Sequence, residues 1–312
     1  MRRLLFMVPI LILISIVIFF LVYMAPGGPM AVYATNPYVS AEELKRIGES
    51  LGLNRPLPIQ YTKWFLSMVK GDWGYSYISG RRVTASIWER VPATLQLTGT
   101  AFFFTVIFGL PLGIIAALRR NTFVDYLLTS GAVVGQSIPV FWLAIMVILI
   151  FSVFLKWIPP GGISTTGMPT NILDRIHHLV APSLVLSTVY IAIWSRYMRS
   201  SLLEVLRQDY VRAARAQGLS EFRVICQHAL RNAILPIINL AGLHAPFFLA
   251  GALVTETVFS WPGIGRLFFD SLNNRDYPIL LGILFIIAII VLMGSLIADV
   301  LCAFADPRIS YD

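Results

Sequence analysis

The sequence predicts an all-α integral membrane protein with six transmembrane helices. Of its 312 residues, 57% are hydrophobic and only 13% are charged, with a mean hydropathy of +0.76. A soluble domain carries about 25% charged residues. The apolar residues are gathered into runs of about 20, the length that crosses a bilayer as a helix. These runs are continuously apolar rather than alternating, so we expect helices and not a transmembrane β-barrel.

Six apolar runs define the expected organisation of the chain. The first is about 22 residues long, beyond the typical core of a cleaved signal peptide, so we expect it to stay as a transmembrane helix. Segment 1–25 then holds the first helix, 26–94 an extracytoplasmic loop with short helices, and 95–312 a five-helix core with a cytoplasmic segment at 200–232. The expected spans are about 4–25, 95–118, 127–155, 179–198, 233–255 and 278–302.

The distribution of basic residues orients these spans. Loops on one side carry Arg119, Arg120 and seven arginines between 196 and 231, whereas the loops at 156–178 and 256–277 carry two basic residues each. Because short cytoplasmic loops are enriched in Lys and Arg, both termini are expected in the cytoplasm. This bias also accounts for the net charge of +8. No nucleic-acid module is visible, so no nucleic-acid partner is expected.

The extracytoplasmic segment has signals for two short helices. Ser40 and Glu43 form a capping box, and this helix is expected to stop near Gly52. A second helix is expected over about 58–69. One face of it carries an aromatic stripe that either rests on the membrane interface or contacts a partner: Tyr61, Trp64, Phe65 and Met68.

Candidates for a solute pathway come from polar or helix-breaking residues in the spans. Pro139 should kink the third span, because proline lacks the backbone donor and clashes with the preceding turn. The kink suits either a pathway wall or ordinary helix packing. A histidine in the fifth span is either a packed or pathway residue or a metal contact, and the first of these is expected. A carboxylate at the end of that span either reaches the interface or serves transport. The candidates are Gln136, Ser137, Pro139, His244 and Glu256.

Catalytic and metal sites are not expected in this chain. A phosphate-binding loop needs Gly-x4-Gly-Lys-Ser/Thr, and none of the four lysines lies in that context. No Ser/His/Asp set, Cys/His set or zinc-ligand spacing is convincing. We therefore expect no ATP site, no catalytic residue and no metal in the chain itself.

The segment between the fourth and fifth spans is basic and helical. One helix is expected over about 202–217, stopped by Gly218, and a second over about 221–231 with Ser220 as its cap. A short helix cannot bury an apolar face alone, so this face needs the rest of the membrane domain, a partner's groove or an anionic lipid surface. The residues expected on it are Phe222, Ile225, Cys226 and Ala229.

Several motifs together resemble the inner-membrane permease subunits of peptide and nickel ABC importers, the dipeptide/oligopeptide permease B type. Ala213, Ala214 and Gly218 are in register with the coupling motif of ABC importer permeases. Arg212 replaces the generic glutamate and Arg231 the generic proline, as is typical of the peptide/nickel subgroup. The other matching strings are Leu51-Gly-Leu-Asn-Arg-Pro-Leu57 with Gln60-Tyr61, Gly71-Asp-Trp-Gly-Tyr-Ser76, Pro92-Ala-Thr-Leu95, Ser137-Ile-Pro-Val-Phe-Trp142, Arg199-Ser-Ser-Leu-Leu-Glu-Val-Leu206, Thr255-Glu-Thr-Val-Phe-Ser-Trp-Pro-Gly-Ile-Gly265, Arg275-Asp-Tyr-Pro278 and Asp306-Pro-Arg-Ile309.

The resemblance implies a type I ABC importer permease fold in a bacterial or archaeal cytoplasmic membrane. It implies a homologous second permease, two cytoplasmic ATPases that bind ATP and Mg, and an extracytoplasmic solute-binding protein. The ATPases would be coupled through Arg212, Ala213, Ala214, Gly218, Leu219, Ser220, Phe222, Arg223, Ile225 and His228. The binding protein would dock on the loops that contain Trp73, Tyr75, Trp261, Pro262, Gly263 and Asp276.

The solute implied by the resemblance is a di- or oligopeptide. Nickel, a metal chelate or glutathione are alternatives within the same architecture. A stand-alone channel or proton-coupled carrier is a different class, which would place ionisable residues at mid-membrane, whereas most charges here lie at span ends. An intramembrane enzyme would need a catalytic set within the spans, and none is found.

Overall fold

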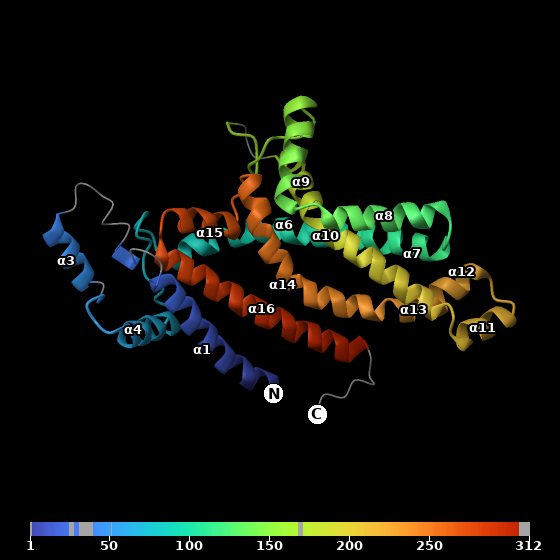
Figure 1. Ribbon diagram of the computed structural model, residues 1–312, viewed down its shortest axis with the longest axis horizontal. Helices are drawn as coiled ribbons and strands as arrows, with labels where there is room; N and C mark the ends of the chain where they lie inside the picture. Colours follow the sequence, from blue (N-terminus) through green and yellow to red (C-terminus); the bar gives the residue numbers. More distant parts are fainter. Residues whose placement is uncertain (1, 25–27, 31–39, 51, 168–170, 306–312) are drawn as a thin grey trace. The chain divides into compact units, whose positions relative to one another are not determined.

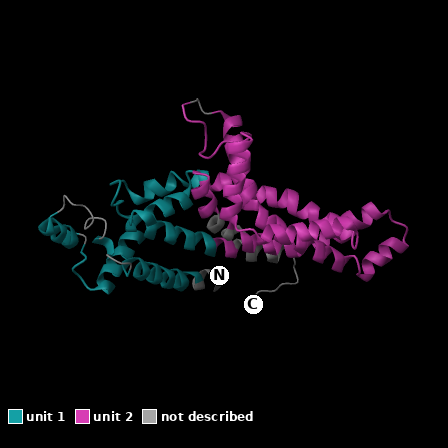
Figure 2. Ribbon diagram, turned by 45° about the horizontal axis from the view of Figure 1, so that its top comes forward, with its two compact units in different colours: residues 1–93, 262–292 teal, residues 94–261, 293–312 magenta. Residues whose placement is uncertain are grey.

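The computed structural model describes residues 2–24, 28–30, 40–50, 52–167 and 171–305. Over these residues the chain is helical, and the only strand-like pairing in them is an isolated bridge between Tyr75 and Arg82. The predicted all-α class is confirmed. The chain forms two compact units, residues 1–93 with 262–292 and residues 94–261 with 293–312 (Figure 2).

The first unit is built around α1 (Arg2–Tyr23), which packs against α4 (Leu57–Val69). Phe19 is fully buried and lies 5.5 Å from the Tyr61 ring and 5.4 Å from the Trp64 ring, measured between centroids. Much of the predicted aromatic stripe therefore contacts α1, a third possibility besides the membrane interface and a partner. The other helices of this unit are α3 (Ala41–Ser50), α5 (Val83–Trp88), α15 (Ile264–Asn273) and the first part of α16 (Tyr277–Ala305).

The capping box at the start of α3 is confirmed. The Glu43 carboxylate accepts from the Ser40 backbone N–H at 2.9 Å, and the Glu43 N–H donates to the Ser40 hydroxyl at 3.2 Å. These hydrogen bonds favour the ionised carboxylate, so the pKa of Glu43 lies below its ordinary value. The helix ends at Ser50, and Gly52 follows in a left-handed conformation at φ +71°.

The second unit is organised around α10 (Ile172–Val205), the longest helix of the unit in the described residues. It contacts α7 (Leu110–Leu118), α8 (Phe123–Ser137), α9 (Val140–Val147) and α14 (Leu235–Val258), as can be followed in Figure 1. The remaining segments are α6 (Val91–Phe104), α11 (Asp209–Ala216), α12 (Glu221–Arg223), α13 (Leu230–Ala233) and the π-helical turns η2 (Thr105–Gly109), η3 (Ile148–Phe154) and η4 (Val224–Ala229).

Two glycines let α7 and its preceding turn approach α10 closely. A Cβ atom on Gly113 would lie 2.4 Å from the Ser195 carbonyl oxygen, and one on Gly109 would lie 3.3 Å from the Trp194 Cβ. The spacing Gly-x3-Gly is the small-residue pattern that allows membrane helices to pack backbone to backbone. This contact fixes the position of the α10 segment that carries the polar residues described below.

The predicted kink at Pro139 is confirmed and is larger than a bend within one helix. Helix α8 ends at Ser137, α9 begins at Val140, and the two segments meet at 100°. Ile138 is extended (φ −79°, ψ 123°), as steric contact with a following proline ring favours.

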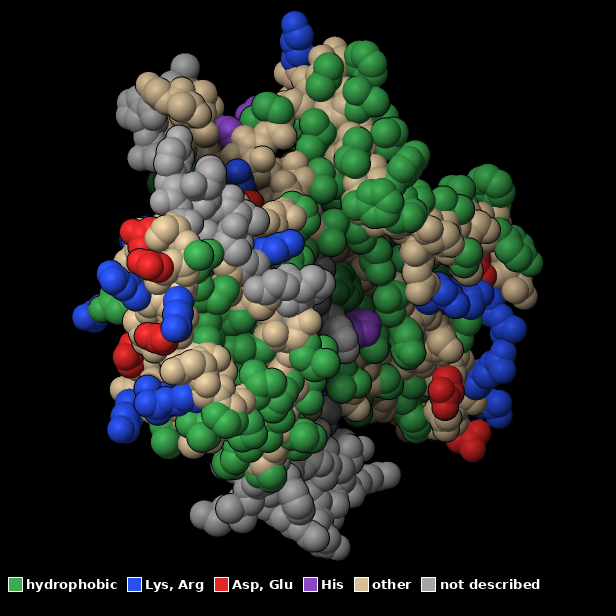
Figure 3. Space-filling view, turned by 60° about the vertical axis from the view of Figure 1, so that its left-hand side comes forward, with side chains coloured by type: hydrophobic (Ala, Val, Ile, Leu, Met, Phe, Trp, Pro, Cys, Tyr) green, Lys and Arg blue, Asp and Glu red, His purple; other side chains and the backbone are tan. Residues whose placement is uncertain are grey.

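In the described residues, each of the six predicted spans lies mostly on helix, although the number of crossings stays a prediction. Among the described residues, three helices are long and apolar enough to cross a membrane, and five if each of two bent pairs counts as one span. The apolar stretch of α1, Met7–Tyr23, is shorter. On the face in Figure 3, hydrophobic side chains form broad continuous areas, as expected of a surface that contacts lipid or other subunits.

Candidate functional sites in the second unit

The first candidate site is a helical elbow, defined here as residues 209–233. Helix α10 ends at Val205 and α11 starts at Asp209, so the predicted helix over 202–217 is broken at 206–208 and its first residues continue the helix of the fourth span. Gly218 follows α11 at φ +78°, a conformation that side chains with a Cβ disfavour. The second helix then runs through α12, η4 and α13 to Ala233, two residues beyond the prediction.

The elbow has a small apolar core of its own. Val211, Ala214 and Val224 are buried together, with Leu219 packed against them. The face predicted for the second helix is wrong in part: Val224 and Ala229 are fully buried, whereas Phe222 is 79% exposed. The reason is the π turn at 224–229, which has more residues per turn than an α-helix and so puts positions five apart on the same face.

Polar contacts hold the parts of the elbow together and join it to α10. The Asn232 amide donates to the Tyr210 hydroxyl at 2.8 Å, which joins α13 to α11. The Ser201 hydroxyl donates to the Ala233 carbonyl at 2.8 Å, which joins α10 to α13. Across the Gly218 turn, the Arg215 guanidinium donates to both oxygens of a carboxylate, Glu221, at 2.8 and 3.4 Å. The elbow is therefore a packed unit rather than a loose loop.

The outer surface of the elbow is basic with an isolated aromatic ring. Among the ten residues predicted to couple to ATPases, Arg212, Ala213, Gly218, Ser220, Phe222 and Arg223 are exposed, and Leu219, Ile225 and His228 are half-buried. Ala214 is buried and so supports the elbow from inside. An exposed aromatic ring surrounded by charge is a typical anchor of a protein interface.

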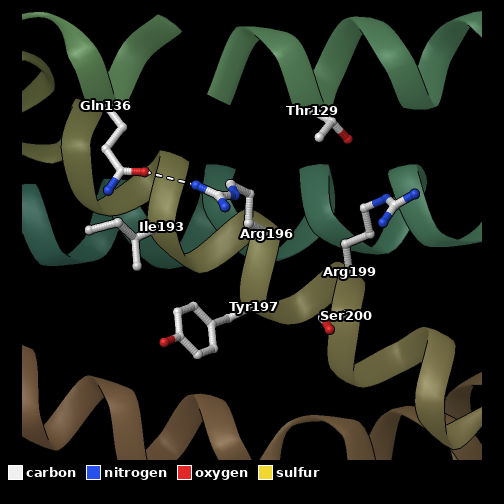
Figure 4. A pocket seen from close by; sticks show the side chains of 7 residues that line it. All are labelled: Thr129, Gln136, Ile193, Arg196, Tyr197, Arg199 and Ser200. Atoms are coloured by element: carbon white, nitrogen blue, oxygen red, sulfur yellow. Dashed lines mark hydrogen bonds between the residues drawn. The ribbon is translucent and has the colours of Figure 1, made fainter. Parts of the chain in front are cut away.

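The second candidate site is a polar pocket between α8 and α10. Its cavity is about 490 Å³. The Arg196 guanidinium of α10 and the Gln136 amide of α8 point toward each other (Figure 4), with the nitrogen donating to the amide oxygen at 3.0 Å. The lining residues are Thr129, Gln136, Ile193, Arg196, Tyr197, Arg199 and Ser200.

A buried carboxylate outside the cavity lining pairs with Arg199, which does line the pocket. Asp125 is almost fully buried and accepts from the Arg199 Nε and Nη2 atoms at 2.6 and 2.7 Å. Its oxygens also accept from the Asn121 N–H at 3.0 Å and the Thr129 hydroxyl at 3.2 Å. This bidentate ion pair links the start of α8 to α10, and the carboxylate compensates the positive charge of Arg199.

The predicted pathway residues do not form one surface in the described chain. Gln136 lines the pocket, while Ser137 and Pro139 are exposed at the α8–α9 break without lining it. His244 is half-buried and accepts a hydrogen bond from the Trp194 indole at 3.1 Å. Glu256 is fully buried and accepts from the Thr94 hydroxyl at 2.7 Å, so it presents no surface within this unit, and its transport role stays a prediction.

The residues predicted to dock a binding protein also differ in exposure. Tyr75 is 55% exposed, whereas Trp73 and Pro262 are half-buried. Trp261 and Gly263 are buried. Both residues are buried parts of the structure with no surface for direct contact, and a docking role of the loop that contains them stays a prediction.

Asp276 is also structural rather than exposed. Only 4% of it is accessible, and its carboxylate accepts from the Ser76 hydroxyl and from the Tyr77 backbone N–H at 3.0 Å. It therefore holds the turn that follows Tyr75 against α16. In the described part of the chain, no group of three or more His, Cys, Asp or Glu side chains could hold a metal ion.

Sequence reasoning missed three features of these sites. Arg196 and the Asp125–Arg199 pair are hidden in the general cytoplasmic charge bias. A signal was available, because arginines three residues apart on a long helix share one face. The Gly109-x3-Gly113 spacing was also available as a packing signal.

Comparison with known proteins agrees with these features. Residues 109–311 match the family described as binding-protein-dependent transport system inner membrane component, and residues 1–98 match its N-terminal counterpart. The oligopeptide transport system permease protein AppB of Bacillus subtilis is 43% identical, over 99% of this chain and 98% of that protein. The dipeptide transport system permease protein DppB of Alkalihalophilus pseudofirmus is 39% identical over 100% and 98%, and the glutathione transport system permease protein GsiC of Escherichia coli is 39% identical over 99% and 98%.

A solved structure supports the fold independently. A chain of the MetNI methionine ABC transporter superposes with a TM-score of 0.60 at 17% identity, covering 72% of this chain and 97% of that one. At this identity the likeness concerns the fold alone. Together with the matches along the whole length, it leads to one conclusion: the chain belongs to the family of inner membrane components of binding-protein-dependent transport systems.

Proposed function

We propose that this chain is the membrane permease subunit of an ATP-driven importer for di- or oligopeptides. The observation that carries the proposal is the 43% identity to an oligopeptide permease over 99% of the chain, which includes the elbow. The solutes named for the three relatives share peptide bonds and free carboxylates. In this proposal the chain crosses a bacterial or archaeal cytoplasmic membrane six times, with both termini and the elbow in the cytoplasm.

The proposed assembly contains a homologous second permease, two ATPases and an extracytoplasmic solute-binding protein. The solute pathway forms between the two permeases. ATP and Mg are bound by the ATPases, because this sequence offers no phosphate-binding loop. Tyr75 is the exposed member of the predicted docking set and the first residue to test for contact with the binding protein.

Coupling in this proposal runs through the elbow. Closure of the ATPase pair on ATP shifts the elbow between two positions, and the spans follow between inward-open and outward-open states. The elbow can transmit this movement because its core and its hydrogen bonds join it to α10 and α14. Phe222 is the expected anchor in an ATPase groove.

Peptide uptake tests the function directly. A strain with this chain should accumulate a radiolabelled peptide, and a strain without it should not. Accumulation of nickel alone would contradict the peptide proposal and favour the metal alternative. Transport by the purified chain alone in liposomes, without ATPases, would instead support the channel or carrier class.

A pair of matched variants tests the coupling role. Phe222→Ala removes an exposed ring from the elbow, and Phe123→Ala removes a ring of equal 79% exposure from the start of α8. Loss of an aromatic anchor costs about 2 kcal/mol or more, so Phe222→Ala should weaken capture of the ATPases about 30-fold. Equal behaviour of the two variants in ATPase co-purification and in uptake would contradict the anchor role.

A further inference from the structure

The α8–α10 pocket separates into a neutral half and a positive half. In the neutral half, the Arg199 guanidinium forms an ion pair with the Asp125 carboxylate. This carboxylate also accepts a hydrogen bond from the Thr129 hydroxyl. In the positive half, Arg196 donates to an uncharged amide, that of Gln136. None of the seven lining residues is acidic, so the cavity itself presents a net positive charge.

Arg196 keeps hydrogen-bonding capacity toward the cavity. A guanidinium carries five N–H donors in a planar fork, and one Nη1 contact is made to Gln136. The side chain is exposed to the cavity rather than covered by protein. A planar fork of this kind matches the two oxygens of a carboxylate and binds them with charge-assisted hydrogen bonds.

The pocket continues along one face of α10. A second cavity of about 380 Å³ shares Arg199 and Ser200 with the first and extends to Gln208. Its further lining residues, Leu203, Glu204 and Arg207, follow Ile193, Arg196 and Ser200 at helical spacing. A polar groove therefore leads from the α8–α9 break to the end of α10, where the elbow begins.

The charges along this groove favour a moving solute over a bound lipid. An anionic lipid headgroup would need several basic residues without nearby acids. Here Glu204 lines the groove, and Arg199 already forms an ion pair with Asp125. Arg207 shares the second cavity with Glu204, whereas Arg196 lies in the first cavity, whose lining residues include no acid. The Arg196 end of the groove therefore suits a molecule that carries a terminal carboxylate.

We propose that Arg196, positioned by Gln136, forms a carboxylate subsite that holds the C-terminal carboxylate of a peptide in the permease. The proposal rests on the peptide function and adds a specificity-determining residue to it. The bond formed is non-covalent, between the guanidinium N–H groups and the two carboxylate oxygens. A hydrogen bond to a charged group at a partly exposed site makes the expected preference for a carboxylate about tenfold.

Equilibrium binding to the nucleotide-free permease–ATPase complex tests this subsite without the external binding protein. The probes are a fluorescent dipeptide and its C-terminal amide. The wild-type complex should bind the acid about tenfold more tightly than the amide. Arg196→Gln should remove this preference and Arg196→Lys should restore part of it, whereas Arg120→Gln, an exposed arginine outside the pocket, should keep it.

Three outcomes overturn the subsite. Equal affinity of the wild-type complex for acid and amide does so, as does an unchanged preference in Arg196→Gln. The third is loss of bound phosphatidylglycerol in Arg196→Gln with no change in the preference, which identifies a lipid headgroup site instead. In any of these cases the proposed peptide transport stands if cells that contain the chain still accumulate the labelled peptide. If those cells do not accumulate it, the proposed peptide transport is itself refuted.

Discussion

Gly113 gives the sharpest test of how the second unit is packed. It lies on α7 against the backbone of α10, and a Cβ atom there would come within 2.4 Å of the Ser195 carbonyl oxygen and 2.7 Å of the Met198 Cβ. Neither neighbour is the free end of a flexible side chain. Gly113→Ala must therefore push the two helices apart by about 1 Å to reach ordinary van der Waals distance.

The expected loss of stability follows from this displacement. Overpacking of a filled interior costs about 1–3 kcal/mol, and the upper part of that range applies because a backbone atom has to move. The separation would also weaken contacts of Trp194 and Met198, two buried members of the cluster that joins α7, α10 and α14. A loss of about 3 kcal/mol corresponds to a fall of about 6–12 °C in the melting midpoint of a unit of this size.

Thermal denaturation of the detergent-solubilised protein, followed by gel filtration, measures this change. Gly131→Ala is the matched control, because Gly131 is also helical but a Cβ atom added to it would meet no atom within 4 Å. Alanine should raise the midpoint slightly there, since it favours a helix by about 1 kcal/mol over glycine. A Gly113→Ala variant that melts within about 1 °C of the wild type would refute the close approach of α7 and α10.

Three further predictions concern the elbow, the pocket and helix α3. Gly218→Val should lower ATP-coupled uptake, whereas Gly218→Asn should keep most of it. The reason is that the left-handed backbone at this position disfavours a β-branched side chain by about 1–2 kcal/mol and tolerates Asn. Equal uptake by the two variants would contradict the strain argument. Asp125→Asn should destabilise the second unit by about 2–3 kcal/mol, seen as a lower melting midpoint, because it leaves Arg199 without its carboxylate. Because the pKa of Glu43 is lowered from 4.5 on folding, its capping contribution is present above that value and is lost as the pH falls through the lower folded-state pKa. Hydrogen-exchange protection of the first turn of α3, corrected for the intrinsic exchange rate at each pH, should fall over that pH range in Glu42→Gln. It should not change with pH in Glu43→Gln, in which the capping side chain no longer titrates.

Local rules predicted the helices well where one strong signal acts alone. The capping box at Ser40, the break at Pro139 and the stop at Gly218 each depend on the chemistry of a few neighbouring residues. Length and hydropathy located the spans because they too are properties of neighbouring residues along the chain. The number of membrane crossings does not follow from such local signals, because bent pairs and a short apolar stretch in α1 satisfy the length criterion only in part.

The errors arose where tertiary packing decides the outcome. An α-helical period assigned the elbow's apolar face to Phe222 and Ala229, but the π turn buries Val224 with Ala229 and leaves Phe222 outside. Glu256 and Trp261 looked accessible because they flank a span end, yet both are buried. Burial of a polar residue beside a helix end depends on partners far away in the sequence, such as Thr94 for Glu256, and no local pattern reveals them.

The position of the elbow in the core has a mechanical consequence. Ala229 and Ala233 belong to the same buried cluster as Trp194, Met198 and Leu202 of α10 and Ile237 of α14. Interiors at this packing density transmit a displacement rather than absorb it, so a force on Phe222 should move α10 and α14 with the elbow. The polar groove lies along α10, and its residue Arg196 falls between Trp194 and Met198 on that helix. Movement of the elbow should therefore change the groove and the exposed surface around Phe222 together, which couples the two without a flexible linker between them.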